Sequence, residues 1–139
     1  MLPVRRLTVS ARLNWLRWLI RTALVLALLI ITWIALTPSP PEMTQMISWD
    51  KANHALAFFV LAGLGQYSVV KGDMTVWILL GFYGVSIEIL QWFGGFRVFE
   101  LYDIVADLVG IGLFALLSPV LLRLPLLRAL KQFDEKEFP

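Results

Sequence analysis

The sequence predicts an all-α, polytopic membrane protein: a four-transmembrane-helix bundle with an N-terminal interfacial helix. The 139 residues are 59% hydrophobic and 16% charged, whereas soluble domains are roughly 45–50% apolar and about 25% charged. Four apolar stretches follow one another along the chain, and each is long enough for a membrane span of about 20 residues. Together the spans leave room only for short loops and two tails, so we expect one compact bundle with no separate soluble domain.

The first element is a basic segment, residues 1–17, in which arginines alternate with Leu and Trp. Tryptophan favours the membrane interface and arginine extends its charge toward water, so this segment reads as an interfacial helix. The first span follows at about 18–36 and ends at a proline-rich loop. A cleaved signal peptide is the competing interpretation, but the basic segment is long and no small-x-small cleavage pattern follows it.

The remaining spans are expected at about 52–70, 74–93 and 103–122, which completes a membrane domain of residues 18–122. A tight turn at 71–73 joins the second and third spans. Gly81 and Gly84 in the third span, and Ala106 and Gly110 in the fourth, offer small faces for close helix contact. Residues 123–139 read as a basic, then acidic, tail.

The basic residues predict the orientation. Ten of the twelve would lie on one side of the membrane, and only Lys51 and Arg97 on the other. The positive-inside rule then places both termini in the cytoplasm, which agrees with an even number of spans. The lipid bilayer is the predicted partner of the arginine-rich start, since anionic headgroups explain it more simply than nucleic acid does.

Polar residues crowd toward the outer ends of the last three spans. Consecutive spans run in opposite directions, so the start of the second, the end of the third and the start of the fourth share one side. We expect a polar pocket there, open to the outer face. The candidate binding residues are Asp50, Lys51, His54, Glu88, Gln91, Arg97, Asp103 and Asp107.

Two interpretations of these residues compete. An interhelical polar contact in a membrane is worth about 0.6 kcal/mol, whereas a charge at the centre of a membrane helix costs about 2.5–3.5 kcal/mol. Bracing alone therefore explains His54, Glu88, Gln91 and Asp107 poorly, and a functional cavity is favoured. Asp50 and the other charged residues at the edge also fit an ordinary hydrated rim.

The residue types restrict the chemistry. The chain has no cysteine and one histidine, which excludes disulfides, thiolate metal sites and zinc sites with several histidines. Its carboxylates could hold Mg²⁺ or Ca²⁺, but no motif requires a cation, so we expect no cofactor. His54, one helical turn after Asp50, could act as a general base. Arg97 and Lys51 could grip a phosphate or carboxylate.

Three short motifs resemble those of VanZ-like membrane proteins. Residues 50–58 resemble the D-K-x-x-H-x-x-x-[FY] element, and residues 88–91 resemble E-x-x-Q. Residues 97–110 resemble R-x(5)-D-x-x-x-N-x-x-G, with Asp107 where Asn is more usual. The resemblance covers about residues 45–115 in the right order. It implies a bacterial cytoplasmic membrane and a role in the cell envelope, since the namesake of the family lowers susceptibility to teicoplanin-type lipoglycopeptides.

The leading expectation is therefore a binding or accessory role, in which the pocket engages an envelope lipid, a cell-wall precursor or a lipoglycopeptide. The alternative is a small membrane enzyme that acts on a lipid-linked phosphate or ester, with His54 and Glu88 as acid and base. Ion or proton passage is a weaker alternative, because the cytoplasmic halves of the spans carry no ionisable relay.

Overall fold

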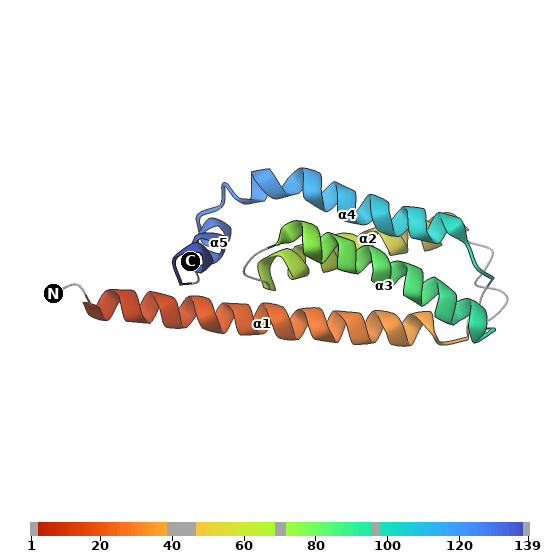
Figure 1. Ribbon diagram of the computed structural model, residues 1–139, viewed down its shortest axis with the longest axis horizontal. Coiled ribbons are helices and arrows are strands. Elements are labelled where there is room, and N and C mark those ends of the chain that lie inside the picture. The colour runs from red at the N-terminus through yellow and green to blue at the C-terminus, as the bar shows by residue number, and fades with distance from the viewer. Residues whose placement is uncertain (1–2, 39–46, 69–71, 96–97, 138–139) are drawn as a thin grey trace.

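The computed structural model describes the backbone of residues 3–38, 47–68, 72–95 and 98–137, and the side chains within 12–38, 50–68, 72–95 and 98–132. These residues form five helices and no strand, which confirms the all-α prediction. Figure 1 shows α1 along one side of the molecule and α4 along the opposite side, with α2 and α3 between them and α5 packed near the first part of α1.

Helix α1 spans Pro3–Ala35 without interruption. The sequence predicts an interfacial segment at 1–17 and a first span from residue 18. The structure has one continuous helix here, with no break between residues 17 and 18. The reason is visible in the sequence, because neither Gly nor Pro occurs between residues 4 and 37. Proline 38 cannot continue the helix, and the Thr37 hydroxyl donates a 2.6 Å hydrogen bond to the Trp33 carbonyl at this end.

The next three helices form an antiparallel set: α2 is Ile47–Ser68, α3 is Asp73–Phe93 and α4 is Leu101–Leu121. Helix α2 begins five residues earlier than the predicted span and so includes Asp50 in its first turn. The positive end of the helix dipole stabilises a negative charge at this position. The turn into α3 uses Gly72 with a φ of 95°, a conformation that glycine adopts without steric cost.

Three described helices are long and apolar enough to cross a membrane: Arg12–Ala35 within α1, Asp73–Phe93 and Leu101–Leu121. This indicates a membrane protein, but the count is three rather than the predicted four. Helix α2 does not qualify, although it has 22 residues. Its first two turns carry Asp50, Lys51 and His54, and Gln66 lies near its end, so its mean hydropathy is too low.

A fifth helix, α5, spans Pro125–Glu137, where the sequence analysis expected only a tail. Proline suits the first position of a helix, where its missing N–H is not needed. Leu127 and Leu130 then lie on one face, and Leu130 is buried with 2% exposure. Burial of this apolar face against α1 and α2 stabilises a helix that the charge pattern of the tail did not suggest.

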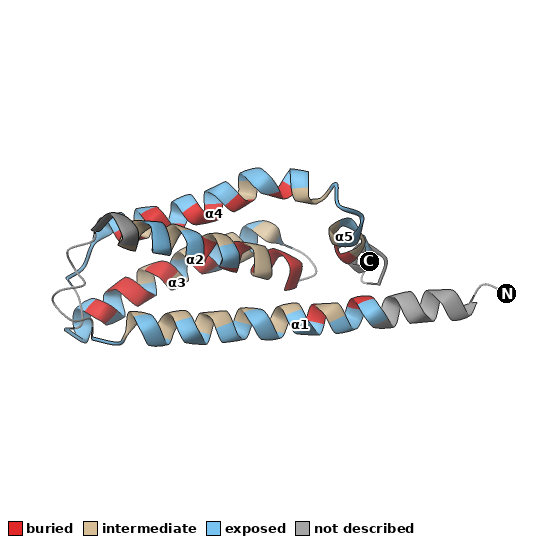
Figure 2. Cartoon of the chain, turned by 180° about the vertical axis from the view of Figure 1, so that it is seen from behind, coloured by how far each residue is buried: buried red, intermediate tan, exposed pale blue. Residues whose placement is uncertain are grey.

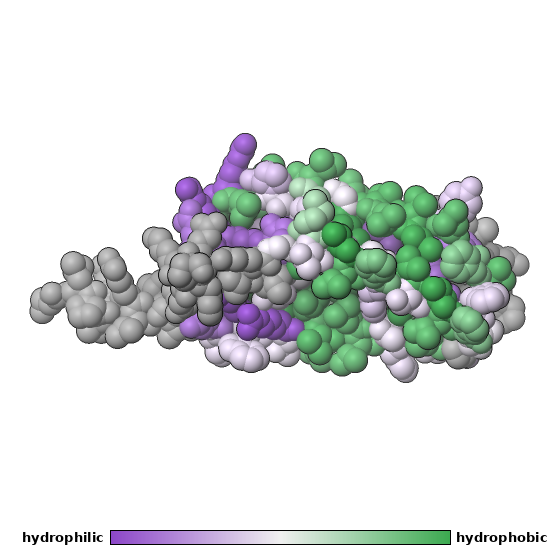
Figure 3. All heavy atoms as spheres, viewed as in Figure 1, coloured by the Kyte–Doolittle hydropathy of each residue, from purple (hydrophilic) through white to green (hydrophobic). Residues whose placement is uncertain are grey.

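The core lies among α2, α3 and α4. Its buried residues include Phe58 and Leu61 on α2, Leu80 on α3, and Ile111 and Phe114 on α4. Figure 2 shows buried residues on the facing sides of these three helices, whereas α1 is mostly exposed or intermediate. The outer surface is apolar over the middle of the molecule in Figure 3, and hydrophilic side chains gather toward the end near α5. An exposed apolar surface of this kind suits contact with lipid.

Candidate functional site

The candidate site lies at the end of the bundle away from α5, where α2 and α4 begin and α3 ends (Figure 1). Helices α2 and α4 approach each other closely here because Gly110 has no side chain. A Cβ atom at this position would lie 2.1 Å from the Ala55 carbonyl oxygen, a backbone atom that cannot move aside cheaply. Small residues allow this kind of close contact in membrane proteins, and here it brings the polar ends of both helices together.

Lys51 on α2 pairs with two carboxylates at the start of α4: Glu100, just before the helix, and Asp103 in its first turn. Its Nζ forms a 2.6 Å ion pair with Glu100 Oε2 and a second ion pair with Asp103 Oδ1. The Lys51 ammonium is thus paired with two carboxylates, one of which, Asp103, is almost fully buried. The ammonium group therefore stays charged, and its charge is already compensated within the site.

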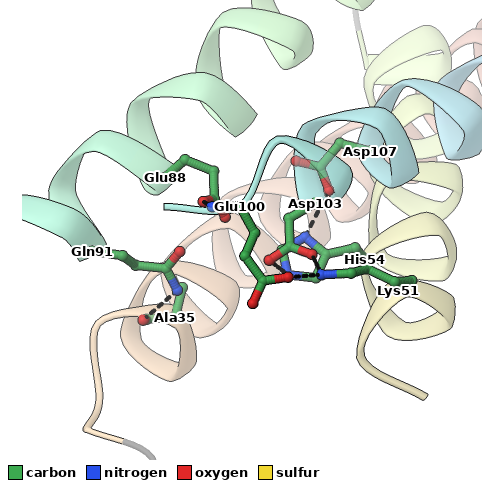
Figure 4. Close-up of polar contacts among 8 residues, drawn as sticks. All are labelled: Ala35, Lys51, His54, Glu88, Gln91, Glu100, Asp103 and Asp107. Carbon is green, nitrogen blue, oxygen red and sulfur yellow. Dashed lines mark hydrogen bonds and ion pairs between the residues drawn. The ribbon is translucent and has the colours of Figure 1, made fainter. Parts of the chain in front are cut away.

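His54 lies one turn further along α2, between two aspartates of α4. Its Nδ1 is 2.9 Å from Asp107 Oδ1, a hydrogen-bond distance, and its Nε2 is 3.8 Å from Asp103 Oδ2. Asp107 in turn occupies space that Gly84 of α3 leaves open, since a Cβ at Gly84 would lie 2.5 Å from Asp107 Oδ2. The histidine ring is thus oriented by contacts on both of its nitrogens (Figure 4).

Glu88 reaches the same region from α3. Its side chain points toward Glu100 and Asp103 in Figure 4, and its Oε2 accepts a 3.2 Å hydrogen bond from the Glu100 backbone N–H. The residue is only 2% exposed. Its second oxygen, Oε1, is buried and has no hydrogen-bond partner among the described residues. A buried polar atom without a partner is costly, and it is usually explained by a water, an ion or a catalytic role at that place.

Two of the predicted residues lie elsewhere. Gln91 is buried, but its Nε2 donates a 2.8 Å hydrogen bond to the Ala35 carbonyl at the end of α1, which ties α3 to α1. Arg97 lies outside the described residues. Asp50 does belong to the group: one ligand atom each from Asp50, His54 and Asp103 lie within 4.8 Å of one another.

Glu100 is a site residue that the sequence pattern does not predict. Its side chain pairs with Lys51 and its backbone N–H binds Glu88. The residue lies in the loop before α4, and a loop position does not reveal its partners by helical periodicity. The one available signal was its spacing of three residues from Asp103, which places both at the start of α4.

The resulting polar cluster, defined here as Asp50, Lys51, His54, Glu88, Glu100, Asp103 and Asp107, is rich in acids. Five carboxyl groups face one lysine and one histidine. An open hollow of about 450 Å³ also lies at this end, but its lining is apolar: Ile89, Trp92, Phe93 and Phe99. The polar cluster is therefore not the lining of this hollow, although Glu88 and Glu100 are sequence neighbours of its residues.

A second set of polar contacts holds the opposite end together. Arg17 Nη2 donates a 2.7 Å hydrogen bond to the Leu130 carbonyl of α5, and Lys131 pairs with Asp73. Within the bundle, Gln66 Nε2 donates a 2.7 Å hydrogen bond to Ser118 Oγ. These contacts tie the predicted cytoplasmic ends of the helices to one another, and they provide positions for control substitutions.

Comparison of the chain with family models, curated proteins and solved structures gives no match. The likeness to VanZ-like proteins consequently depends on the short motifs alone.

Proposed function

We propose that this chain is a four-span membrane protein with a binding or accessory role in the cell envelope, of the VanZ-like kind. In this proposal the polar cluster opens to the outer leaflet and holds the polar part of an envelope ligand. The observation that carries it is Glu88: a buried carboxylate on α3, directed at a cluster from α2 and α4, with one oxygen that lacks a described partner.

The path of the chain supports a fourth crossing by α2. Helix α1 ends, and α3 begins, at opposite ends of the molecule (Figure 1). If α1 and α3 both cross the membrane, the segment between them has to return through it. Helix α2 makes this return while packed against α1, α3 and α4. Because its neighbours cover much of its surface, α2 needs less apolarity than a helix surrounded by lipid.

The proposed orientation follows from charge. The basic residues of α1 and α5 lie at the end opposite to the polar cluster. The positive-inside rule places that end in the cytoplasm and the cluster toward the outside. A ligand delivered from outside the cell could then reach the cluster without crossing the bilayer.

The chemistry of the ligand follows from the cluster and its surroundings. Lys51 is neutralised by Glu100 and Asp103, so the described residues offer an acidic site with an open hydrogen-bond acceptor at Glu88. Such a site favours a ligand that presents hydrogen-bond donors or positive charge. The neighbouring apolar hollow fits a ligand with a hydrocarbon part, such as an envelope lipid, a lipid-linked cell-wall precursor or a lipoglycopeptide.

The test is a phenotype measured at matched protein levels. We expect a susceptible bacterium that expresses the chain to tolerate more of a teicoplanin-type lipoglycopeptide, and His54→Ala, Glu88→Gln and Arg97→Ala to abolish the gain. Asp73→Asn, which alters a carboxylate at the opposite end, should keep it. If these three variants accumulate normally in the membrane and protect as well as the unsubstituted chain, the proposal is wrong.

A second candidate function is catalysis, and the 2.9 Å contact between His54 and Asp107 favours it. An aspartate that orients an imidazole is a common arrangement for a general base, and Glu88 would be the corresponding acid. Turnover of a labelled lipid-linked phosphate or ester by the purified protein, lost in His54→Ala, would support an enzyme. Binding of the same lipid without turnover would support the binding role.

A further inference from the structure

We propose that Asp50, His54 and Asp103 bind one divalent metal ion of the Mn²⁺ and Zn²⁺ class at the outer end of the bundle. One ligand atom from each residue already lies within 4.8 Å of the other two. Three ligands that are each about 2.0–2.2 Å from a tetrahedral metal lie about 3.3–3.6 Å apart, so the three side chains have to close by up to about 1.5 Å to bind one ion. His54 Nε2 and Asp103 Oδ2, 3.8 Å apart, are already close to that spacing. The inference deepens the proposed function, but its test does not depend on it.

The first supporting feature is the orientation of His54. Asp107 Oδ1 lies 2.9 Å from Nδ1, which fixes the ring with its N–H on that nitrogen when the imidazole is neutral. The lone pair of Nε2 is then directed toward Asp103, whose Oδ2 lies 3.8 Å away. A carboxylate that holds one nitrogen of a histidine while the other binds a metal is the usual outer support of a metal site.

The second feature is that the two oxygens of the Asp103 carboxylate have different partners. Its Oδ1 pairs with Lys51, and its Oδ2 faces His54. Lys51 therefore fixes the orientation of the carboxylate without occupying the oxygen that would bind a metal. Asp50 lies one helical turn before His54 on the same face of α2, so two of the three ligands come from one rigid helix.

The third feature is the excess of negative charge in the polar cluster, to which the buried Glu88 carboxylate contributes. Glu88 is 2% exposed and projects toward the cluster from α3 (Figure 4), and its Oε1 lacks a partner among the described residues. Its carboxylate lies within electrostatic reach of His54, Asp103 and Asp107. An ionised carboxylate buried at low dielectric is costly unless it is paired or bound to a metal, and a divalent cation held by Asp50, His54 and Asp103 would supply positive charge to the group.

The donor set points to the type of metal. An imidazole nitrogen with carboxylate oxygens suits Zn²⁺ and Mn²⁺, whereas Mg²⁺ and Ca²⁺ prefer oxygen ligands alone.

The experiment uses the purified full-length chain in detergent micelles after treatment with a chelator. We expect about one Mn²⁺ ion per chain by electron paramagnetic resonance, displaced by Zn²⁺ and not by an equal concentration of Mg²⁺. His54→Ala and Asp103→Asn should weaken Mn²⁺ binding more than tenfold. Asp107→Asn should weaken it by roughly 10–100-fold, as is usual for a partner that only orients a ligand. Asp73→Asn is the matched control and should bind like the unsubstituted chain.

Thermal unfolding provides a second readout, because a metal that binds only the folded state raises the midpoint of unfolding. The half-buried Asp50→Asn is the variant least disruptive to folding, and it should show a smaller rise with Mn²⁺ than the unsubstituted chain. The inference is overturned if the unsubstituted chain binds neither Mn²⁺ nor Zn²⁺, or if His54→Ala and Asp50→Asn bind as tightly as it does. Loss of the lipoglycopeptide phenotype in His54→Ala without any metal binding would overturn this inference and leave the proposed function in place.

Discussion

At the scale of single residues, Lys51 has two partners in unequal surroundings. The Glu100 side chain is 48% exposed, whereas the Asp103 side chain is 4% exposed. Water screens the first pair, so it contributes little, and the second pair compensates a charge that has almost no access to solvent. The two bonds of one ammonium group should therefore differ clearly in energy.

This difference is measurable with two double-mutant cycles. We expect the cycle of Lys51→Met with Glu100→Gln to give a coupling of about 0.2–1 kcal/mol. The cycle of Lys51→Met with Asp103→Asn should lie toward the upper end of the roughly 0.5–3 kcal/mol range for contacting residues. The readout is the free energy of unfolding in mixed micelles with increasing denaturing detergent. Equal couplings in the two cycles would contradict the assignment of Asp103 as the buried partner.

The sequence predicts best the positions of residues that depend on helix geometry alone. His54 and Asp107 could be placed near each other because α2 and α4 were expected to start on the same side, and the structure joins them at 2.9 Å. Glu100 could not be found in this way, because its position depends on how the loop returns to Lys51 and Glu88. Gln91 has the burial expected of a site residue, but its partner is the end of α1.

At the scale of helices, the contact of α2 with α4 depends on Gly110. The sequence suggested a small face at Ala106 and Gly110, but not which helix would use it. The structure shows that α2 does, with the Ala55 carbonyl in the space where a side chain would start. Periodicity marks a face as suited for close contact, whereas the identity of the partner depends on packing of the whole bundle.

Gly110→Ala and Gly112→Ala form a matched pair on the same helix. A methyl group at position 110 would meet the Ala55 carbonyl at 2.1 Å, whereas position 112 has nothing within 4 Å. We expect Gly110→Ala to lower the free energy of unfolding by about 1–3 kcal/mol, the usual cost of overpacking. Gly112→Ala should be neutral or slightly stabilising because alanine favours the helix. Equal stability of the two variants in a thermal unfolding assay would show that α2 and α4 are not in close contact.

The helix boundaries also separate into those that the local sequence determines and those that depend on packing. The end of α1 before Pro38 and the start of α3 after Gly72 were located to within a few residues, since proline and glycine interrupt a helix for local reasons. Helix α5 was missed because its stability comes from the burial of Leu130 against other helices. Its leucine spacing was present in the sequence, but the mixed charges of the segment favoured a tail.

At the scale of the whole molecule, the central question is the number of crossings. A chain without cysteine allows each position to be labelled without background. We expect Val98→Cys, exposed in the loop before α4, to react with a membrane-impermeant thiol reagent on intact cells. Met74→Cys at the start of α3 and Arg123→Cys after α4 should react only once the membrane is opened.

Met74→Cys is the decisive position. If α2 did not cross, the start of α3 would lie on the same side as the end of α1, and Thr37→Cys and Met74→Cys would react under the same conditions. The unsubstituted chain is the control for non-specific labelling. Labelling of both Thr37→Cys and Met74→Cys on intact cells would contradict the fourth crossing and, with it, the proposed orientation of the cluster.

The polarity of α2 has a consequence for how the protein is made. A helix that carries Asp50, Lys51 and His54 in its first two turns is poorly suited to leave the translocation channel for lipid by itself. Its counter-charges on α4 are synthesised about 50 residues later, and α4 begins with two aspartates that have the same difficulty. If α2 crosses the membrane as proposed, neither helix completes its insertion alone. The two would enter lipid together, after the whole bundle has left the ribosome.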